Sequence, residues 1–406
     1  MGIEFIDGGV TAAKGFLAGG VHCGIRKNKS KLDLGMIYSD VLCNAAAAYT
    51  QNLVKGAPIL VTQKNLENGT ARAVIVNSGN ANTGNADGIA KAQRMCEIAG
   101  EELGIPPSDV IVASTGVIGQ ELPIEPIEQS AKALHESLSY DGSGKAALAI
   151  MTTDTYTKEV AVSCEIGGKT VVIGGIAKGS GMIHPNMATM LSFVTTDCAI
   201  TPAMLKCAIN KTCDETFNMI SVDGDTSTND TYAVLASGLA GNPEINCENE
   251  DFAVFCEALE SVCRKLAMLL AGDGEGATKL LICKVLNAAD SQMAKQTAKA
   301  IISSSLIKAA MFGEDANCGR ILCAVGYAGV PVDPQKIDVS YSSSKGEILV
   351  CENGNGIKFS EEKASAVLSD KEITIIVDLK LGSDCAVAYG CDLTYDYVRI
   401  NGDYRT

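Results

Sequence analysis

A glycine-rich segment that runs directly into an apolar stretch constrains this chain more than any other feature, and it lies near the middle of the sequence. It starts at Lys178 and reads Lys-Gly-Ser-Gly-Met-Ile-His-Pro-Asn-Met-Ala-Thr-Met-Leu-Ser-Phe, so that Ala188 directly precedes Thr189. The residues after Thr189 are mostly apolar and β-prone. An ordinary glycine loop that enters a buried strand has the same pattern, and this is the more common arrangement.

A second interpretation is that the chain cuts itself between Ala188 and Thr189. A threonine hydroxyl is a weak nucleophile unless a base lies beside it. A threonine at a chain N-terminus carries its own base, because its α-amine has a pKa of about 7.7–8.0. Cleavage would give an alpha chain of residues 1–188 and a beta chain of residues 189–406 that begins with the nucleophile Thr189.

The charge of the chain argues against two classes of partner. Its formal net charge is −15, and it has no long basic run. Nucleic acids and anionic membrane surfaces both require basic patches, so we expect neither. No apolar run reaches the ~20 residues that span a bilayer. The start of the chain lacks the basic and apolar regions of a secretory signal, so we expect a cytoplasmic protein.

Cysteine and histidine usage narrows the chemistry further. The sixteen cysteines are scattered, and no Cys-x-x-Cys occurs. We therefore expect reduced thiols that serve as small core residues, and no metal site. Of the three histidines, only His184 lies near the candidate nucleophile in sequence, so a Ser-His-Asp triad is poorly supported.

The apolar pattern predicts a mixture of strands and helices. The predicted strands cover residues 73–77, 110–113, 170–174, 373–378 and 386–389. The predicted helices cover residues 89–103, 124–139, 251–271 and 289–311, and another starts at Thr201-Pro202. This irregular mixture indicates an α+β fold with helices packed on sheets, and periodicity alone does not give the topology.

The central segment closely resembles the self-cleavage site of the ornithine acetyltransferase / glutamate N-acetyltransferase family of arginine biosynthesis. Further matching blocks are Val222-Asp-Gly-Asp-Thr-Ser-Thr-Asn-Asp-Thr, Gly272-Asp-Gly-Glu-Gly-Ala-Thr, Gly319-Arg-Ile-Leu and the tail from Cys391 to Thr406. Together with Gly9-Val-Thr and Lys14-Gly-Phe, they extend the resemblance over essentially the whole chain. Several blocks are too long to arise by chance.

The resemblance implies a fold, an assembly and a reaction. The fold would be a layered α/β/β/α core shared by two self-cleaved chains, with an additional C-terminal α/β region, assembled as two alpha and two beta chains. Thr189 would first attack the Ala188 carbonyl during maturation. In turnover it would take the acetyl group of N-acetylornithine, release ornithine, and pass the acetyl group to glutamate as N-acetylglutamate. No cofactor is implied, and whether acetyl-CoA is also a donor stays open.

The resemblance also assigns roles to individual residues. Thr115 and Gly116, at the end of a predicted strand, would form the oxyanion hole, although Thr-Gly alone is typical of a plain turn. Without the resemblance, the glycine-rich acidic segment Gly272–Gly276 would be interpreted as a solvated turn or a calcium-like loop. The residues expected to contact substrate are Thr152, in preference to its neighbour Thr153, together with Lys178, Thr189, Glu275, Asn401 and Thr406.

Some positions depart from the family, and two other functions remain possible. The chain has Cys318 and Tyr389 where tryptophan is common, and Gly402 where alanine is usual, which we interpret as packing changes. The run Asp223–Asp230 is interpreted as a structural loop without a catalytic role. The alternatives are a self-cleaving aminopeptidase or amidase of the same superfamily, and a non-catalytic scaffold that keeps the fold.

Overall fold

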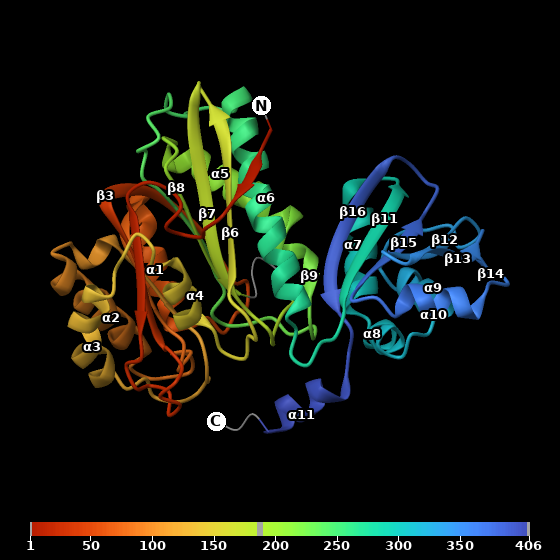
Figure 1. Ribbon diagram of the computed structural model, residues 1–406, viewed down its shortest axis with the longest axis horizontal. Helices are drawn as coiled ribbons and strands as arrows, with labels where there is room; N and C mark the ends of the chain where they lie inside the picture. Colours follow the sequence, from red (N-terminus) through yellow and green to blue (C-terminus); the bar gives the residue numbers. More distant parts are fainter. Residues whose placement is uncertain (1, 185–189, 404–406) are drawn as a thin grey trace. The chain divides into compact units, whose positions relative to one another are not determined.

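The computed structural model describes residues 2–184 and 190–403, and the chain divides into two compact units. The first unit contains Met1–Gly179, Pro185–Asn218 and Thr226–Leu266, and the second contains Ser180–His184, Met219–Asp225 and Ala267–Thr406. Figure 1 shows the elements of both units. The units differ from the two predicted cleavage pieces, because strands on both sides of the predicted cut belong to the first unit.

The first unit is built on one mixed sheet. Its described strands are β1 (Glu4–Ile6), β2 (Phe16–Val21), β3 (Leu34–Tyr49), β4 (Thr70–Asn77), β5 (Val110–Ser114), β6 (Lys158–Ile166), β7 (Lys169–Lys178), β8 (Leu191–Thr196) and β10 (Thr231–Ala236). They follow the order β1-β6-β7-β8-β10-β3-β4-β5, and β2 also pairs with β3. The strands predicted at 73–77, 110–113 and 170–174 are confirmed as parts of β4, β5 and β7.

Helices cover both faces of this sheet. Successive residues of a strand point to opposite faces, so neighbouring residues of β4 pack into different cores. Ala73 and Ile75 of β4 pack into a core that also contains side chains of α1 (Ala57–Asn65), α2 (Gly88–Leu103) and α3 (Glu125–Glu136). Val74 and Val76 pack into a second core, which contains α4 (Ser143–Ile150). The predicted helices 89–103 and 124–139 are confirmed as α2 and α3.

Two further helices complete the elements of this part of the chain. Thr201 caps α5 (Pro202–Glu215) by accepting a hydrogen bond from the Met204 N–H, as the sequence predicts. The predicted helix 251–271 is confirmed as α6 (Glu250–Gly272). The hydroxyl of Tyr232 in β10 lies 3.1 Å from the Cys263 Sγ, which connects α6 to the sheet. The short 3-10 turns are η1 (Leu66–Asn68), η2 (Pro107–Asp109) and η3 (Phe217–Met219).

The second unit has its own mixed sheet. Its described strands are β9 (Ile220–Ser221), β11 (Leu280–Ala288), β12 (Asp338–Ser343), β13 (Gly346–Glu352), β14 (Asn355–Gly356), β15 (Glu372–Asp378) and β16 (Asp384–Cys391), in the order β14-β13-β12-β15-β11-β16-β9. The helices are α7 (Ser291–Ser303), α8 (Ser305–Phe312), α9 (Cys318–Gly326), α10 (Glu361–Leu368) and α11 (Tyr395–Asp403). Side chains of α7, α8, α9 and α10 share one core with the sheet.

One helix prediction in the second unit is wrong. The sequence predicts a single helix over 289–311, but the structure breaks it at Ser304 into α7 and α8. Ser304 has an extended backbone, with φ −71° and ψ 113°, and its hydroxyl accepts a hydrogen bond from the Ile307 N–H. Serine commonly takes this capping role, so local hydrogen bonding overrides the continuous apolar pattern. The predicted strands at 373–378 and 386–389 are confirmed as parts of β15 and β16.

The predicted α+β class, with helices packed on sheets, is confirmed by both units. All sixteen cysteines are free thiols, as expected, and most of them are buried or partly buried. Within residues 2–184 and 190–403, no helix combines the length and apolar character that a membrane crossing needs. The same residues contain no group of three or more metal-binding side chains.

Candidate functional site

The turn that follows β5 has a backbone that only glycine can adopt. Thr115 leaves the strand with its N–H donating to the Asn77 carbonyl over 2.9 Å. Gly116 then has φ 129°, in a region that side chains disfavour. A Cβ on Gly116 would lie 2.7 Å from the Gly79 carbonyl carbon. Both the positive φ of Gly116 and its close approach to Gly79 therefore favour glycine at this position of the turn.

The turn offers fewer free backbone donors than a strand end can provide. The Thr115 N–H is not free, because it donates to the Asn77 carbonyl where β4 and β5 continue to pair. The hydroxyl of Thr115 remains, and it lies 3.4 Å from the Lys178 Nζ. The Gly116 N–H has no hydrogen-bond partner among the described residues. A hydroxyl and one N–H are thus the donors that this turn offers.

Asn229 supports the same turn from the acidic run Asp223–Asp230. Its amide donates to the Ser114 carbonyl over 3.0 Å, directly before Thr115, and also to the Ala81 carbonyl. Its own carbonyl accepts the Thr83 hydroxyl over 2.6 Å. These contacts support the structural role predicted for this run.

Lys178 is the last residue of β7 and is 7% exposed. Lysine is seldom buried unless it has a charged partner, and sequence reasoning missed that partner. Burial lowers the pKa of Lys178, and the charge of Asp154 opposes this decrease. Asp154 is itself buried and accepts a hydrogen bond of 2.7 Å from the Nζ of the buried Lys158. Burial alone would raise the pKa of Asp154, but Lys178 and Lys158 hold it well below its usual range.

Asp154 also bonds the backbone of two predicted substrate segments. One carboxylate oxygen accepts the Thr152 N–H over 2.9 Å, and the other accepts the Gly179 N–H over 2.7 Å. The sequence gives no signal for this role, because an Asp and a Lys four residues apart usually form an exposed pair. The contact of Asp154 with the Thr152 N–H does not decide between Thr152 and Thr153 as the substrate residue.

The second unit brings Glu275 and Asn401 together. The Asn401 side-chain amide donates to the Glu275 carboxylate over 2.7 Å. The Glu275 N–H donates to the Ser180 carbonyl over 3.0 Å, and the Ser180 hydroxyl donates to the Asp273 carbonyl over 2.6 Å. The glycine-rich segment therefore has fixed contacts with the acidic loop after α6. A Cβ on Gly181 would lie 2.5 Å from the Glu275 carboxylate, so a larger residue at this position would displace that carboxylate.

Three predicted site residues fall outside the described ranges: Ala188, Thr189 and Thr406. The other predicted site residues are divided between the two units. Thr115, Gly116, Thr152 and Lys178 belong to the first unit, and Glu275 and Asn401 belong to the second. Met190 follows the predicted cut directly, and its carbonyl accepts the Thr231 N–H over 3.0 Å.

Comparison with known proteins agrees with the motifs. The model of the ArgJ family matches residues 17–406. The arginine biosynthesis bifunctional protein ArgJ of Caldanaerobacter subterraneus subsp. tengcongensis is 50% identical over 405 residues, and the match covers 100% of both chains. The protein of the same name from Symbiobacterium thermophilum is 49% identical over 406 residues, again covering 100% of each chain.

A solved structure also matches part of the chain. The crystal structure of arginine biosynthesis bifunctional protein ArgJ from Bacillus halodurans has 48% sequence identity and a TM-score of 0.51. The match covers 53% of this chain and 100% of that one. These matches confirm the resemblance predicted from the motifs. Because the family model spans nearly all of the sequence and the relatives are about half identical over their full lengths, the chain belongs to the ArgJ family.

Proposed function

We propose that the protein transfers the acetyl group of N-acetylornithine to glutamate through an acetyl-Thr189 intermediate. The observation that carries the proposal is the Thr115 hydroxyl, 3.4 Å from the buried Lys178 Nζ, at the start of the segment that leads to Thr189. This places hydrogen-bond donors and a cation together, as acyl transfer to a carboxylate-bearing substrate requires. Membership of the ArgJ family supports the same reaction.

Maturation would use the same hydroxyl. The Thr189 Oγ1 attacks the Ala188 carbonyl carbon, the peptide C–N bond breaks, and the freed nitrogen takes a proton to become the α-amine. Water then hydrolyses the resulting ester, which leaves a carboxylate on Ala188 and restores the hydroxyl of Thr189.

Turnover would proceed in two halves. The α-amine of Thr189 accepts the hydroxyl proton as the Oγ1 attacks the acetyl carbonyl, and ornithine leaves with a proton on its amine. Glutamate then attacks the acetyl-threonine and takes the acetyl group. In each tetrahedral intermediate, the Thr115 hydroxyl and the Gly116 N–H would stabilise the oxyanion. Lys178 and Thr152 would bind the substrate carboxylate end, and Glu275 with Asn401 and Thr406 would bind its amino end.

We propose two extensions of this function. Because the relatives are named bifunctional, the first is that acetyl-CoA also acetylates Thr189, so that the enzyme makes N-acetylglutamate by a second route. We also propose an assembly of two alpha and two beta chains in the cytoplasm, where the free cysteines would stay reduced.

The test combines mass and activity. Mass spectrometry of the purified protein is expected to show one fragment that ends at Ala188 and another that starts at Thr189. Donor assays with N-acetylornithine and with acetyl-CoA, each with glutamate as acceptor, then separate the two activities. A chain that remains intact and transfers no acetyl group from either donor would refute the proposed function and favour a scaffold.

A further inference from the structure

A single buried carboxylate links the two segments of the first unit that are expected to contact substrate. Asp154 is 5% exposed, and its oxygens accept the backbone N–H groups of Thr152 and Gly179 over 2.9 and 2.7 Å. Gly179 directly follows Lys178, so Asp154 fixes the backbone at both positions. Lys158, which is fully buried, neutralises Asp154 through a contact of 2.7 Å.

Asp154 also acts on the Lys178 side chain through its charge. The charged groups that act on Lys178 are Asp154, Lys158, Asp230 and Arg26, with the Thr115 hydroxyl also in contact. Burial raises the pKa of Asp230 well above its usual value. The pKa of Asp154 is instead lowered, so it stays ionised. Of the charged groups that act on Lys178, Asp154 has the largest effect.

We propose that Asp154 is a positioning residue of the acetyl-transfer site, which holds Thr152 and Lys178 in register and keeps the buried Lys178 side chain cationic for a substrate carboxylate. The inference rests on the proposed function, because it takes Lys178 as a substrate contact. Lys158 has the opposite electrostatic effect: it balances Asp154 but repels the charge on Lys178.

Two variants with opposite expected effects test this role. The protonation of Lys178 is followed by its reductive methylation with formaldehyde and cyanoborohydride, which reduces the imine, at a series of pH values, read by mass spectrometry. Asp154→Asn should move the midpoint of Lys178 reactivity to lower pH, because the opposing charge is lost. Lys158→Met should move it to higher pH, because a like charge is lost. A general packing defect would move both variants in the same direction, and that result would overturn the proposal.

Kinetics give a second readout, and a conservative variant guards against misfolding. In Asp154→Asn, KM for N-acetylornithine should rise about tenfold at mildly alkaline pH and recover as the pH falls, because Lys178 regains its proton. Asp154→Glu keeps the charge and should retain the wild-type midpoint of Lys178. A midpoint in Asp154→Glu that follows Asp154→Asn would contradict the proposal. The labelling also works in Thr189→Ala, so a failure of acetyl transfer itself is recognised separately.

A different observation, the open edge of β3, carries a second inference. The pairing of β3 with β4 ends where Asn44 lies opposite Thr70, while β10 continues to cover the other edge as far as Tyr49. The Ala45 N–H points to the β4 side, where it donates to the Gly69 carbonyl. Because backbone direction alternates along a strand, the backbone groups of Ala47 point to the same open edge.

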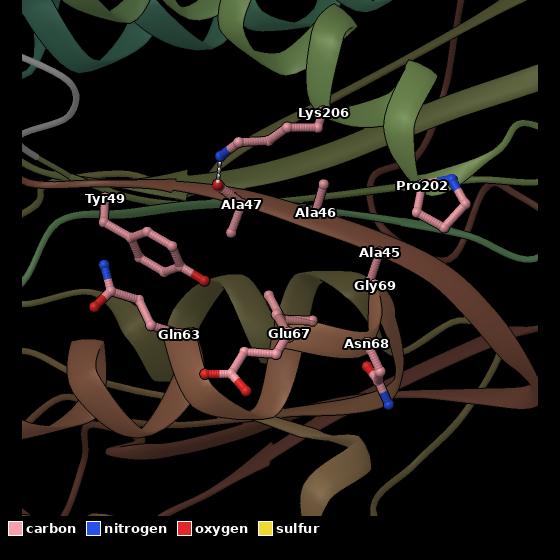
Figure 2. Close-up of a pocket in the computed structure, with 11 residues that line it drawn as sticks. Ala45, Ala46, Ala47, Tyr49, Gln63, Glu67, Asn68, Gly69, Pro202 and Lys206 are labelled. Atoms are coloured by element: carbon pink, nitrogen blue, oxygen red, sulfur yellow. Dashed lines mark hydrogen bonds between the residues drawn. The ribbon is translucent and has the colours of Figure 1, made fainter.

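This edge borders a cavity whose lining includes hydrogen-bond donors and an acceptor. The Ala47 carbonyl accepts from the Lys206 Nζ, whereas the Ala47 N–H has no partner among the described residues. The cavity has a volume of about 370 Å³, a size typical of small-molecule sites. Figure 2 shows Lys206 on one side of β3, and Tyr49 with Glu67 on the other. The lining residues belong to β3, α1, η1, the following Gly69 and the start of α5.

The geometry points to a binding site for a small α-amino acid in its zwitterionic form. The Ala47 N–H and Lys206 would receive the carboxylate, and Glu67 would receive the ammonium group. None of the residues predicted for acetyl transfer lines this cavity, so the inference is independent of the proposed reaction.

Thermal melting with a panel of α-amino acids tests this site. Glutamate and ornithine are omitted, since both would bind at the acetyl-transfer site. At least one amino acid is expected to raise the melting temperature of the wild type but of neither Lys206→Met nor Glu67→Gln. The matching carboxylic acid without the amino group should have no effect. No shift with any amino acid, or a shift that persists in both variants, would overturn the assignment.

Discussion

The Asn401 side-chain amide donates a hydrogen bond of 2.7 Å to the Glu275 carboxylate, across 126 residues of sequence. Asn401 belongs to α11, none of whose described side chains is buried. We predict that Asn401→Asp, which places two carboxylates together, lowers kcat/KM at least tenfold. Because Asn401 is on the exposed helix, the free energy of unfolding should change by only about 0.5 kcal/mol. Acetyl-transfer assays and denaturant unfolding of the same sample measure both effects.

Removal of the whole tail from Asn401 gives the matched comparison. The truncated chain should still cleave at Ala188-Thr189, because maturation needs the nucleophile and oxyanion donors but no substrate. Its acetyl transfer should be lost. Full activity in the truncated protein would show that the tail from Asn401 onward is ordinary surface.

Thr189→Ala should remain a single chain and be inactive. Maturation and turnover require the same hydroxyl, so one substitution abolishes both. Thr189→Ser keeps a hydroxyl and should cleave but turn over slowly. Denaturing electrophoresis and an acetyl-transfer assay separate the two effects, and normal cleavage of the alanine variant would exclude Thr189 as the nucleophile.

Gly181→Ala should reduce activity by displacing Glu275. The added Cβ would lie 2.5 Å from the Glu275 carboxylate carbon, which is closer than any normal contact. The carboxylate would have to move, and small displacements at a catalytic site lower the rate steeply. Gly326→Ala at the end of α9 is the control, because its Cβ would meet nothing within 4 Å. Equal activity in both variants would argue against a role for Glu275.

The rate of acetyl transfer by the mature enzyme should fall as the pH drops below about 7.5, because the proposed base is an α-amine. Protonation removes the lone pair that accepts the Thr189 hydroxyl proton. Single-turnover rates across mildly acidic to mildly alkaline pH isolate the chemical step. A rate that is flat over this range would argue against the amine as the base.

His184 should make folding stability depend on pH. Its Nδ1 lies 3.0 Å from the Ser221 Oγ, and burial, together with the Lys299 charge, lowers its pKa from 6.5 to about 4. Between these values the unfolded chain binds a proton that the folded chain does not, so stability falls as the pH drops from 6.5 to 4.

The slope cannot exceed about 1.4 kcal/mol per pH unit, and the partial exposure of His184 makes it smaller. Unfolding of the uncut Thr189→Ala protein at a series of acidic pH values measures it. His184→Gln in the same background should have a flatter slope between pH 6.5 and 4. An unchanged slope would assign the effect to other groups.

Sequence patterns predicted the long elements of the fold well and the contacts of the site poorly. The apolar repeat of α6 and the β-branched run of β4 identify their elements, because each buries a regular face. The split at Ser304 was missed, since one capping hydroxyl overrides a continuous apolar pattern. The importance of Asp154 could not be predicted, because its partners Thr152, Lys158 and Gly179 meet only after β6 and β7 pair.

The strand order of the first sheet determines how a cut chain would hold together. β7 precedes the predicted cut and β8 follows it, and the two pair along six residues. β8 and β10 are inserted between β7 and β3, so strands of the later piece lie inside a sheet made by the earlier one. Neither piece could leave without breaking two complete ladders of hydrogen bonds. Cleavage would therefore produce interlocked fragments that survive or unfold together, and the peptide bond would be needed to build the sheet but not to keep it.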